Sequence, residues 1–527
     1  MARFPLTALA ILAGSAACAD TTLHILHTND WHSRLEPVDK YNATCTPEAD
    51  AAGECFGGVA RLKTLVDRLR GDLAGEHVLL LDAGDQFQGS LMYTAYKGAE
   101  VAEIMTRLGY QAMAVGNHEF DDGPVNLARF IDGVSFPVVS GNLDLTTEPA
   151  LSGKIADRVV IDMGGLKVGI VSALATDTVD TSSPGPNVVF EDEIAAMTAD
   201  VAALEAEGVT HVIGLTHVGL PVDVTLAEAV PGLDAIVGGH SHTLLSNTAE
   251  GAVGPYPLMV GEVPVVTAMA YSRYLGHLTL TFDDAGKVTA ATGDVIPLDA
   301  SVVNDPEIAA RVTELAQPFV ELKARVVGQT AAPIDGSSDS CRKMECEMGN
   351  LVADAMLDAV RGQGVTIALT NGGGLRAGIE AGEITMGDVL TVLPFQNTLA
   401  TFETQGAVII DALENGLSQV EDLKGRFPQV AGLRFTWDPS VGPNEGRVQE
   451  VFVQQGEDWV PIDPEGSYLV ATNNYVRNGG DGYRMFVEAE RAYDYGPGLE
   501  DVVAAYLARI GGTYTPYTDG RIEKVGG

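Results

Sequence analysis

The sequence predicts an α/β protein of two domains. Apolar, β-branched runs alternate along the chain with helical patterns, which is typical of layered α/β folds. The chain has 527 residues, of which 46% are hydrophobic and 20% are charged, so disordered and fibrous classes are excluded. A second α/β segment begins after about residue 325, and it is long enough to bury a core of its own.

The first segment is expected to contain strands at the positions where short apolar runs occur. These strands are Leu23–His27, Val78–Leu81, Ala112–Val115, Val212–Leu215 and Ala235–Val237. Helical patterns lie between them, at Gly58–Leu69, Ala99–Leu108 and Glu193–Glu207. The alternation of the two kinds of element supports the α/β assignment.

Turn residues interrupt two further apolar segments, which we predict to be β-hairpins. Arg158–Ser172 breaks at two consecutive glycines, and Leu278–Ile296 breaks at Asp283–Gly286. Asp305-Pro306 then opens a helical stretch that runs to about Arg325. We interpret this helix as a linker, which gives an N-terminal domain at 20–304, a linker helix at 305–325 and a C-terminal domain at 326–527.

The charge balance excludes some classes of partner. With 32 Lys and Arg against 72 Asp and Glu, the net charge is −40. Such a chain repels phosphate backbones and anionic lipid surfaces, so we expect no nucleic-acid partner. No apolar stretch reaches the ~20 residues that span a bilayer, so we expect no membrane span. An anionic substrate therefore requires a local positive site.

The first 19 residues are typical of a signal peptide, which predicts a periplasmic or secreted protein. Arg3 precedes the apolar run Phe4–Leu12, and small residues follow up to Ala19. Ser15 stands three places before Cys18, where a lipoprotein signal has a larger apolar residue, so we expect no lipidation. The C-terminus carries no hydrophobic tail, so we expect no lipid anchor there.

Four cysteines remain in the mature chain, in two short-range pairs. Cys45 pairs with Cys55 and Cys341 with Cys346 in this prediction, because an exported chain favours disulfides. Metal ligation by these cysteines is the alternative.

Side chains of the metal-binding type follow all five predicted strands. They occur in Thr28-Asn29-Asp30-Trp31-His32, Asp82-Ala83-Gly84-Asp85, Gly116-Asn117-His118-Glu119, Thr216-His217 and Gly238-Gly239-His240-Ser241-His242. Ligands gather at the carboxyl ends of strands in open α/β sheets, so these loops are expected to converge. A pair of divalent metals needs a shared carboxylate, and a mixture of Asp, His and Asn suits Zn, Mn or Fe(II). His24, His27, His77 and His211 lack this context and are expected to be structural.

These loops, in this order, resemble the signature of the metallophosphoesterase superfamily. The resemblance implies two metal sites that share Asp85 as the bridging ligand. One site would comprise Asp30, His32, Asp85 and His242, and the other Asp85, Asn117, His217 and His240. It also implies that His118 and Asp121 form a catalytic dyad, in which a cationic His118 stabilises phosphoryl oxygens and assists the leaving alkoxide.

Motifs of the second half are similar to the C-terminal domain of the 5′-nucleotidase family. They are Cys341-Arg342-Lys343-Met344-Glu345-Cys346, Thr370-Asn371-Gly372-Gly373-Gly374-Leu375-Arg376, Leu393-Pro394-Phe395 and the segment from Asn473 to Tyr483. The resemblance implies an N-terminal metallophosphoesterase domain of four layers, α/β/β/α, followed by an α/β substrate-binding domain.

The chemistry of these residues suits a nucleotide. Phe395 and Tyr475 can stack on a base, although the family pattern has Phe where this chain has Tyr475. Asp481 can accept hydrogen bonds from ribose hydroxyls, and Asn371 can bind a base edge. The group is completed by two guanidinium side chains for phosphate and sugar oxygens, Arg342 and Arg376.

The resemblance implies an exported dimetal hydrolase that releases phosphate from nucleoside 5′-monophosphates with a metal-activated water. We expect Zn, with Mn or Co as alternatives. A hydrolase of UDP-sugars or nucleoside diphosphates with cyclic phosphodiesterase side activity is a second hypothesis, and a dimetal hydrolase of another anion is a third. A non-catalytic periplasmic nucleotide-binding module is the hypothesis from a different class. The oligomeric state does not follow from the sequence.

Overall fold

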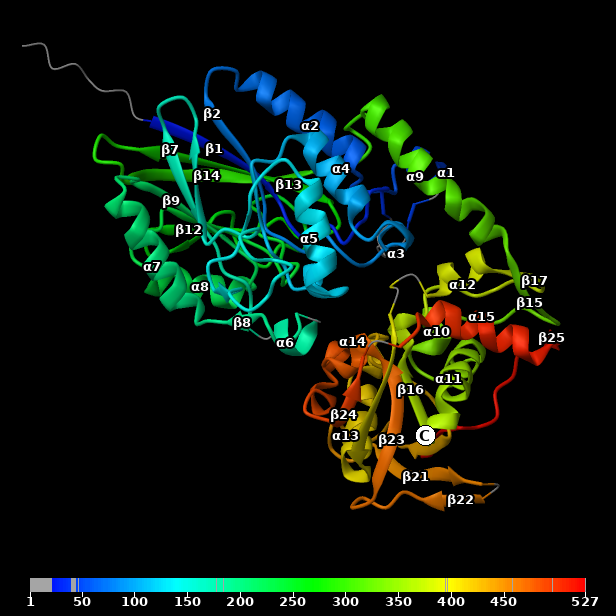
Figure 1. Cartoon of the computed structure of the whole chain (residues 1–527). Helices are drawn as coiled ribbons and strands as arrows, with labels where there is room; N and C mark the ends of the chain where they lie inside the picture. Colours follow the sequence, from blue (N-terminus) through cyan, green and yellow to red (C-terminus); the bar gives the residue numbers. More distant parts are fainter. Residues whose placement is uncertain are drawn as a thin grey trace, which may run out of the picture. The chain divides into compact units, whose positions relative to one another are not determined.

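A computed structural model describes residues 21–38, 44–45, 47–176, 178–182, 184–393, 395, 397–456, 458–494 and 496–526. The predicted signal peptide, residues 1–19, lies outside these described residues. The chain forms two compact units, the first mainly from residues up to Ile308 and the second mainly from the residues after it (Figure 1). In the described part of the chain, no helix has both the length and the apolar character that crossing a membrane requires.

The first unit contains two six-stranded sheets. The first sheet has the order β14-β13-β1-β2-β3-β4, in which β1 to β4 run parallel and β13 and β14 form an antiparallel hairpin. Its strands are β1 (Thr21–Thr28), β2 (His77–Asp82), β3 (Ala112–Ala114), β4 (Val138–Val139), β13 (Tyr274–Phe282) and β14 (Val288–Pro297). The predicted strands at 23–27, 78–81 and 112–115 and the second predicted hairpin all belong to this sheet.

The second sheet has the order β11-β12-β10-β9-β7-β6. The four central strands run parallel, and an antiparallel strand closes each edge. Its strands are β6 (Arg158–Asp162), β7 (Lys167–Val171), β9 (His211–Thr216), β10 (Ala235–Gly238), β11 (Leu258–Val260) and β12 (Val263–Val266). The predicted hairpin at 158–172 is the pair β6 and β7, and its turn at Gly164 and Gly165 has positive φ at both residues.

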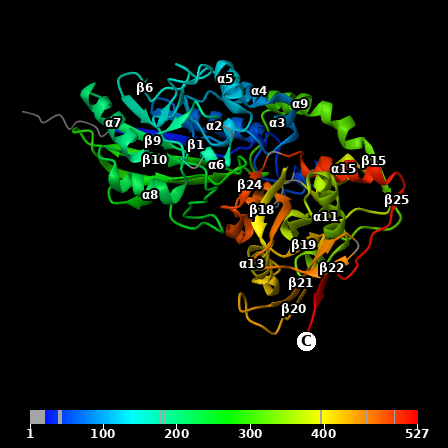
Figure 2. The same cartoon turned by 60° about the horizontal axis from the view of Figure 1, so that its bottom comes forward.

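The two sheets of the first unit pack face to face. Leu23 and Leu79 from the first sheet share one buried cluster with Ile213 and Val237 from the second. Helices lie along the outer sides, as Figures 1 and 2 show. They are α2 (Val59–Asp72), α4 (Ala99–Leu108) and α5 (Gly123–Gly133) beside the first sheet, and α7 (Glu193–Ala206) and α8 (Leu220–Ala229) beside the second. The predicted four-layer α/β/β/α architecture is therefore confirmed.

The second unit is built on a five-stranded sheet of order β19-β16-β23-β18-β24. Alternate residues of β16 belong to different buried clusters, with Ala368 on one face and Leu369 on the other. Side chains of a strand alternate between faces, so this sheet is covered on both sides. Its strands are β16 (Ile367–Asn371), β18 (Leu399–Gln405), β19 (Pro428–Ala431), β23 (Ser467–Asn473) and β24 (Glu490–Tyr493).

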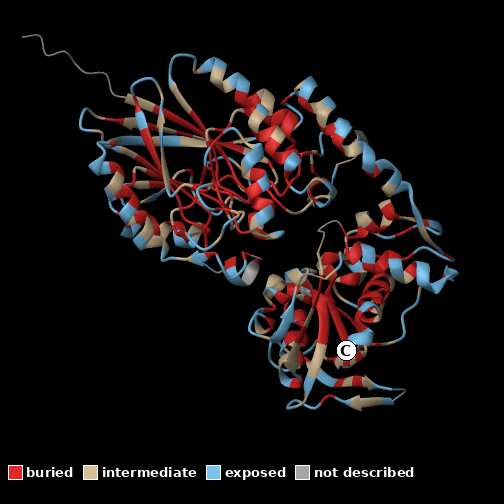
Figure 3. Ribbon diagram, viewed as in Figure 1, coloured by how far each residue is buried: buried red, intermediate tan, exposed pale blue. Residues whose placement is uncertain are grey.

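Helices and two smaller sheets cover the central sheet of the second unit. The helices α11 (Glu347–Val360), α12 (Met386–Val392) and α15 (Leu499–Ile510) pack on one face, and α13 (Gly406–Leu417) packs on the other. The smaller sheets are β15 (Val326–Thr330) with β17 (Gly382–Thr385) and β25 (Thr513–Tyr514), and β20 (Leu433–Trp437) with β21 (Val448–Gln455), β22 (Asp458–Pro461) and β26 (Ile522–Lys524). Figure 3 shows the buried residues concentrated in the central strands and on the helix faces turned toward them.

The helix predicted at 305–325 is present as α9 (Pro306–Ala324), and its role as a linker stays a prediction. At the N-terminus of this helix, Asp305 Oδ1 accepts hydrogen bonds from the amides of Glu307 at 3.0 Å and Ile308 at 2.9 Å. These bonds explain why the helix begins there. The remaining short elements are α1 (Pro47–Ala51), α3 (Leu91–Tyr96), α6 (Thr178–Thr181), α10 (Ser338–Cys341), α14 (Asn474–Arg477), β5 (Leu143–Asp144) and β8 (Val189–Phe190). The exact boundaries of the domains and the linker stay a prediction.

Candidate metal centre and binding cluster

The carboxyl ends of parallel strands bring the predicted metal ligands together. In the first sheet, Thr28 at the end of β1 pairs with Asp82 at the end of β2, and in the second sheet Thr216 pairs with Gly238. The loops after these strands and after β3 therefore all leave from the carboxyl ends of their strands, which form one edge of each sheet. All seven predicted ligands lie at this edge: Asp30, His32, Asp85, Asn117, His217, His240 and His242.

One group of ligand atoms comprises Asp30, His32 and His242, whose donor atoms lie within 4.8 Å of one another. The Nε2 atoms of His32 and His242 are 2.9 Å apart, and His242 Nε2 is 3.4 Å from Asp30 Oδ1. The backbone carbonyl of Phe87 lies 3.2 Å from His32 Nδ1 and can only accept, so Nδ1 carries the ring proton. His32 Nε2 therefore presents a lone pair to the group, as metal ligation requires.

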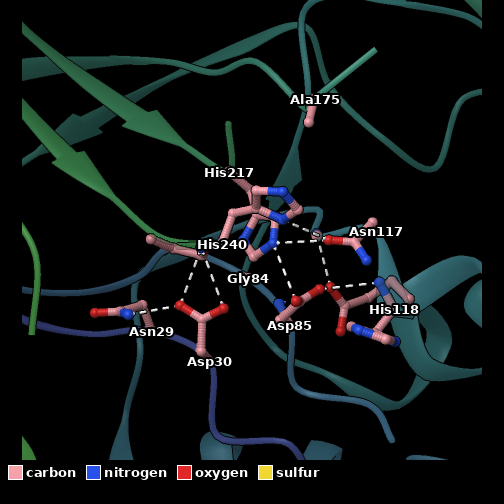
Figure 4. A network of polar contacts seen from close by, with 12 residues as sticks. Asn29, Asp30, Gly84, Asp85, Asn117, His118, Ala175, His217 and His240 are labelled. Atoms are coloured by element: carbon pink, nitrogen blue, oxygen red, sulfur yellow. Dashed lines mark hydrogen bonds and ion pairs between the residues drawn. The ribbon is translucent and has the colours of Figure 1, made fainter. Parts of the chain in front are cut away.

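The second group comprises Asp85, His217 and His240. Figure 4 shows these side chains converging, together with Asn117. His217 Nε2 is 3.1 Å from Asp85 Oδ2 and 3.2 Å from Asn117 Oδ1, and His240 Nδ1 is 2.8 Å from the same Asn117 oxygen. His217 Nδ1 donates to the carbonyl of Ala83 at 2.6 Å, so Nε2 is the ring nitrogen that faces Asp85 and Asn117, and a metal ion would bind there in place of its proton.

Asp85 lies between the two groups. Its Oδ2 atom is 3.1 Å from His217 Nε2 in one group and 4.0 Å from His32 Nε2 in the other. Burial would raise the pKa of Asp85, but His217 and His118 hold that pKa well below its ordinary value, so the carboxyl is ionised. An ionised carboxylate in this place suits a ligand shared by two cations.

The electrostatics of the site suit cations. Burial, together with the charge of His242, lowers the pKa of His32 to about 3, so the ring is neutral, as a ligand must be. Burial also lowers the pKa of His217, but the carboxylates of Asp85 and Asp30 outweigh it and raise that pKa to about 10. These carboxylates create a negative potential that also stabilises a divalent cation. The donor set of Asp, His and Asn thus fits two divalent metal ions.

Many of these ligands lie on strained backbone. Positive φ angles occur at Asp30 (54°), His32 (52°), Asp85 (58°), His240 (75°) and His242 (50°). The left-handed region costs a residue with a side chain about 1–2 kcal/mol. Strain of this kind persists where the surrounding structure imposes it, and it is concentrated at functional sites. The loops are therefore shaped to present these side chains.

Glu119 is a residue of the site to which sequence reasoning assigned no role. Its buried carboxylate accepts four backbone hydrogen bonds, from the amides of Asp85 at 2.9 Å, Gln86 at 2.7 Å, Phe87 at 3.1 Å and Gly116 at 2.6 Å. These bonds join the loop after β2 to the loop after β3. The available signal was its place as the last residue of the Gly116–Glu119 motif.

The predicted dyad adjoins these ligands, because His118 forms a third group with His32 and Asp85, whose donor atoms also lie within 4.8 Å of one another. His118 begins a 3-10 helix (His118–Phe120), and its Nδ1 is 2.7 Å from Asp121 Oδ2. Burial lowers the pKa of His118, but Asp121 and Asp85 raise it to about 10, so the ring is cationic. The His118 amide also donates to Asp85 Oδ1 at 2.9 Å (Figure 4). Since Nδ1 is engaged by Asp121, Nε2 is the ring atom available for chemistry.

The histidines predicted to be structural have partners away from the two groups. His27 is fully buried, with Nε2 2.8 Å from the hydroxyl of Tyr256, and His24 lies 3.0 Å from His277. His211 packs edge-on against Phe282. Neither these residues nor His77 belong to the metal-type groups found among the described residues.

In the second unit, three of the predicted nucleotide-binding residues contact one another. Asn371 Nδ2 donates to Asp481 Oδ2 at 2.6 Å, and the hydroxyl of Tyr475 donates to Asp481 Oδ1 at 3.2 Å. The Asp481 amide donates back to the Tyr475 hydroxyl at 3.1 Å. Asp481 has a φ of 52°, and Tyr475 is 47% exposed.

The other predicted residues of this unit lie on neighbouring loops. Arg376 Cζ lies 5.6 Å from the centre of the Phe395 ring, and Arg376 Nη1 donates to the carbonyl of Gly373 at 3.3 Å. Arg342 Nη1 donates to the carbonyl of Leu423 at 3.3 Å. The structure thus places Phe395 against a guanidinium group, whereas Tyr475 contacts a carboxylate.

Both predicted disulfides are present, Cys45–Cys55 and Cys341–Cys346. Gln429 of β19 is a second constraint on the loop that carries Arg342. Its Nε2 donates to the carbonyls of Cys341 at 3.0 Å and Met344 at 2.8 Å, and its Oε1 accepts from the Cys346 amide at 3.2 Å. The loop is therefore fixed at both ends of the disulfide.

Comparisons with known proteins cover nearly the whole chain. Residues 23–244 match the family model of calcineurin-like phosphoesterases, and residues 326–488 match that of the 5′-nucleotidase C-terminal domain. The chain is 38% identical to 5′-nucleotidase of Homo sapiens and 37% identical to that of Bos taurus, in each case over 99% of this chain and 94% of the relative. The crystal structure of a 5′-nucleotidase precursor from Thermus thermophilus is 40% identical, with a TM-score of 0.71, and covers 96% of this chain and 99% of that one.

Proposed function

The chain belongs to the 5′-nucleotidase family, and we propose that it hydrolyses nucleoside 5′-monophosphates such as AMP to the nucleoside and phosphate. It is a metal-dependent phosphoric monoester hydrolase. The observation that carries the proposal is the pair of ligand groups around Asp85, next to a cationic His118. A protein that only binds nucleotides has no use for a histidine–aspartate dyad at such a centre.

We further propose Zn as the metal, with Mn and Co as alternatives. One ion would be held by Asp30, His32, Asp85 and His242, and the other by Asp85, Asn117, His217 and His240. When bound, two divalent ions supply Lewis-acid stabilisation of the phosphoryl oxygens and activate the attacking water.

The protein's own groups then handle the departing alkoxide. His118 Nε2 donates its proton to the ribose O5′ as the bond to phosphorus breaks, and Asp121 stabilises the imidazolium through Nδ1. Glu119 keeps the Asp85 loop in place through its backbone hydrogen bonds. His118, Asp121 and Glu119, which carry these roles, all belong to the first unit.

The second unit would supply nucleotide recognition. Asp481 accepts from the ribose hydroxyls, Asn371 binds the base edge, and Phe395 and Tyr475 stack on the base. Arg342 and Arg376 bind phosphate and sugar oxygens, which provides the positive charge that the net −40 of the chain withholds. We propose 20–304 and 326–527 as the domains that carry the two tasks.

We propose that the chain is exported and that residues 1–19 are removed. Two disulfides support this, because such bonds form and persist in oxidising compartments. Mass spectrometry of the protein recovered from the periplasm or medium tests it: a mature N-terminus at Asp20 is expected, and a full-length cytosolic chain contradicts export.

The substrate proposal is tested by product release from AMP, ADP, UDP-glucose and bis(p-nitrophenyl) phosphate, measured as phosphate for AMP and ADP, as UMP for UDP-glucose and as p-nitrophenolate for the diester. The protein is stripped with a chelator and then resupplied with Zn, Mn or Co. We expect fast, metal-restored release from AMP and slow release from the others. Preference for ADP or UDP-glucose would instead indicate a broader nucleotide hydrolase, and no release from any substrate would indicate a binding protein.

A further inference from the structure

The carboxylate of Asp121 is held by three side chains from separate segments of the first unit. Oδ2 accepts from His118 at 2.7 Å and from Gln88 Nε2 at 3.2 Å. Oδ1 accepts from the hydroxyl of Ser182 at 2.7 Å. Ser182 is only 5% exposed and the Asp121 side chain 13%, so water competes little for these bonds.

Backbone contacts connect Ser182 to the metal centre by a different route from His118. The Ser182 amide donates to the carbonyl of Thr178 at 3.0 Å, at the end of α6. The amide and hydroxyl of Thr178 donate to the carbonyl of Ala175 at 3.1 and 2.7 Å. The Ala175 amide in turn donates to the carbonyl of His217 at 3.0 Å. The position of Ser182 is thus tied to His217, the predicted metal ligand that directly follows β9.

The two carboxylate oxygens of Asp121 therefore bind two separate segments, one that carries His118 and one that carries Ser182. A carboxylate bound through one oxygen can turn about its Cβ–Cγ bond, whereas bonds to both oxygens fix its plane. The plane of Asp121 sets the direction of its bond to His118 Nδ1, and so the direction in which Nε2 points. An imidazole that transfers a proton depends on such support for its alignment.

We infer that Ser182 is a positioning residue for phosphate release: it fixes Asp121 so that His118 Nε2 faces the departing oxygen. This inference rests on the proposed function, in which His118 protonates that oxygen. Ser182 touches neither the substrate nor the ligand groups in this account. It therefore acts on turnover and not on substrate affinity.

The test compares substrates whose leaving groups differ in their need for a proton. For AMP, Ser182→Ala is expected to lower kcat about tenfold, as loss of a hydrogen bond to a charged group does, with KM within about twofold. Hydrolysis of p-nitrophenyl phosphate should stay at the wild-type rate, because p-nitrophenolate leaves without a proton. Ser182→Thr retains the hydroxyl and should restore turnover of AMP. If Ser182→Ala does not fold, Ser182→Cys, which is similar in size and a weaker donor, should show the same split.

Ser246 offers a matched control in the same unit. Its hydroxyl donates to Asp294 Oδ1 at 2.7 Å, and it is 7% exposed, so the bond resembles that of Ser182 but lies outside the ligand groups. Ser246→Ala should leave kcat for both substrates unchanged.

Two results would overturn the role of Ser182. One is a Ser182→Ala variant with wild-type kcat for AMP, measured beside a His118→Ala variant that has lost it. The other is an equal loss for both substrates, which Ser182→Thr does not rescue. Failure of the proposed function looks different, because the wild-type protein itself would then release no phosphate from AMP or His118→Ala would remain fully active.

Discussion

The backbone amide of Asp85 donates a hydrogen bond of 2.9 Å to the buried carboxylate of Glu119. The two residues belong to loops that follow neighbouring strands, β2 and β3. Three further amides bind the same carboxylate, so Glu119 substitutes for the water that would otherwise solvate this tight turn. The backbone of Asp85, the shared ligand of the proposed centre, is therefore fixed by a side chain that we do not expect to bind metal.

Replacing Glu119 is expected to weaken metal binding. Glu119→Gln loses one acceptor oxygen and places an NH2 group against backbone amides, so the Asp85 loop should shift. Support of this kind is typically worth about 10- to 100-fold in metal affinity. Competition with a chelator, read as bound metal per chain, measures the change directly.

Asp200→Asn is the control for Glu119→Gln. Asp200 is also a buried carboxylate of the first unit, but it pairs with Arg158 at 3.0 Å and belongs to neither ligand group. The Asp200→Asn substitution should lower the melting temperature and leave the metal content unchanged. Wild-type metal affinity in Glu119→Gln would show that the four amide bonds do not support the centre.

The hydroxyl of Tyr475 is expected to contribute to nucleotide binding through Asp481. Tyr475→Phe keeps the ring for base stacking but removes both hydrogen bonds to Asp481. Because Tyr475 is 47% exposed, water can replace part of what is lost, so KM for AMP should rise about two- to fivefold, with kcat unchanged. Steady-state kinetics measure this, with Tyr493→Phe on β24 as the control. A KM equal to that of the wild-type protein would mean that Asn371 alone orients Asp481.

Removing the Cys341–Cys346 disulfide should weaken substrate binding more than it unfolds the protein. The disulfide constrains the loop that carries Arg342, and the hydrogen bonds from Gln429 continue to hold that loop when the disulfide is absent. The double variant Cys341→Ser/Cys346→Ser is expected to raise KM for AMP about threefold, while the melting temperature changes little. The matched pair Cys45→Ser/Cys55→Ser should leave KM unaltered. An unchanged KM in the first variant would refute a role for this disulfide in binding.

Glu500 should make the second unit less stable as the pH rises. Burial raises the pKa of Glu500, near the start of α15, from 4.5 to about 7. The folded state therefore binds this proton more tightly than the unfolded state, so the stabilisation is complete below about pH 4.5 and is lost as the pH rises toward 7. A shift of this size corresponds to roughly 3 kcal/mol in the free energy of unfolding.

Glu500→Gln removes that dependence. Chemical denaturation at pH 5 and pH 8 should show the variant gaining stability relative to the wild-type protein at the higher pH. Asp501→Asn, an exposed neighbour on the same helix, should show no such gain. Equal pH dependence in Glu500→Gln and the wild-type protein would rule out Glu500 as the responsible group.

Much of the fold was predictable from local sequence. The mainly apolar runs at 23–27 and 212–215 became central strands, because buried parallel strands are rich in apolar residues. The polar residues directly after them, such as Asp30 and His217, could be placed at a sheet edge for the same reason. The helical pattern at 99–108 matches α4, which begins after Gly98 and ends before Gly109.

The supporting residues could not be predicted in this way. Ser182 meets Asp121 across 61 residues of sequence, and Gln429 meets Cys341 across 88. No local pattern encodes such contacts, because they depend on how separate loops pack. Glu119 was visible in a motif, but its four partners are backbone amides, which have no sequence signature.

The central claim is that two metal ions at the centre around Asp85 drive the release of phosphate. The most direct measurement is phosphate release from AMP by chelator-stripped protein, followed as Zn is added in known equivalents per chain. We expect negligible release without metal and a rise that reaches its maximum at two equivalents. Full activity in the stripped protein, or a maximum at a single equivalent, would contradict the claim.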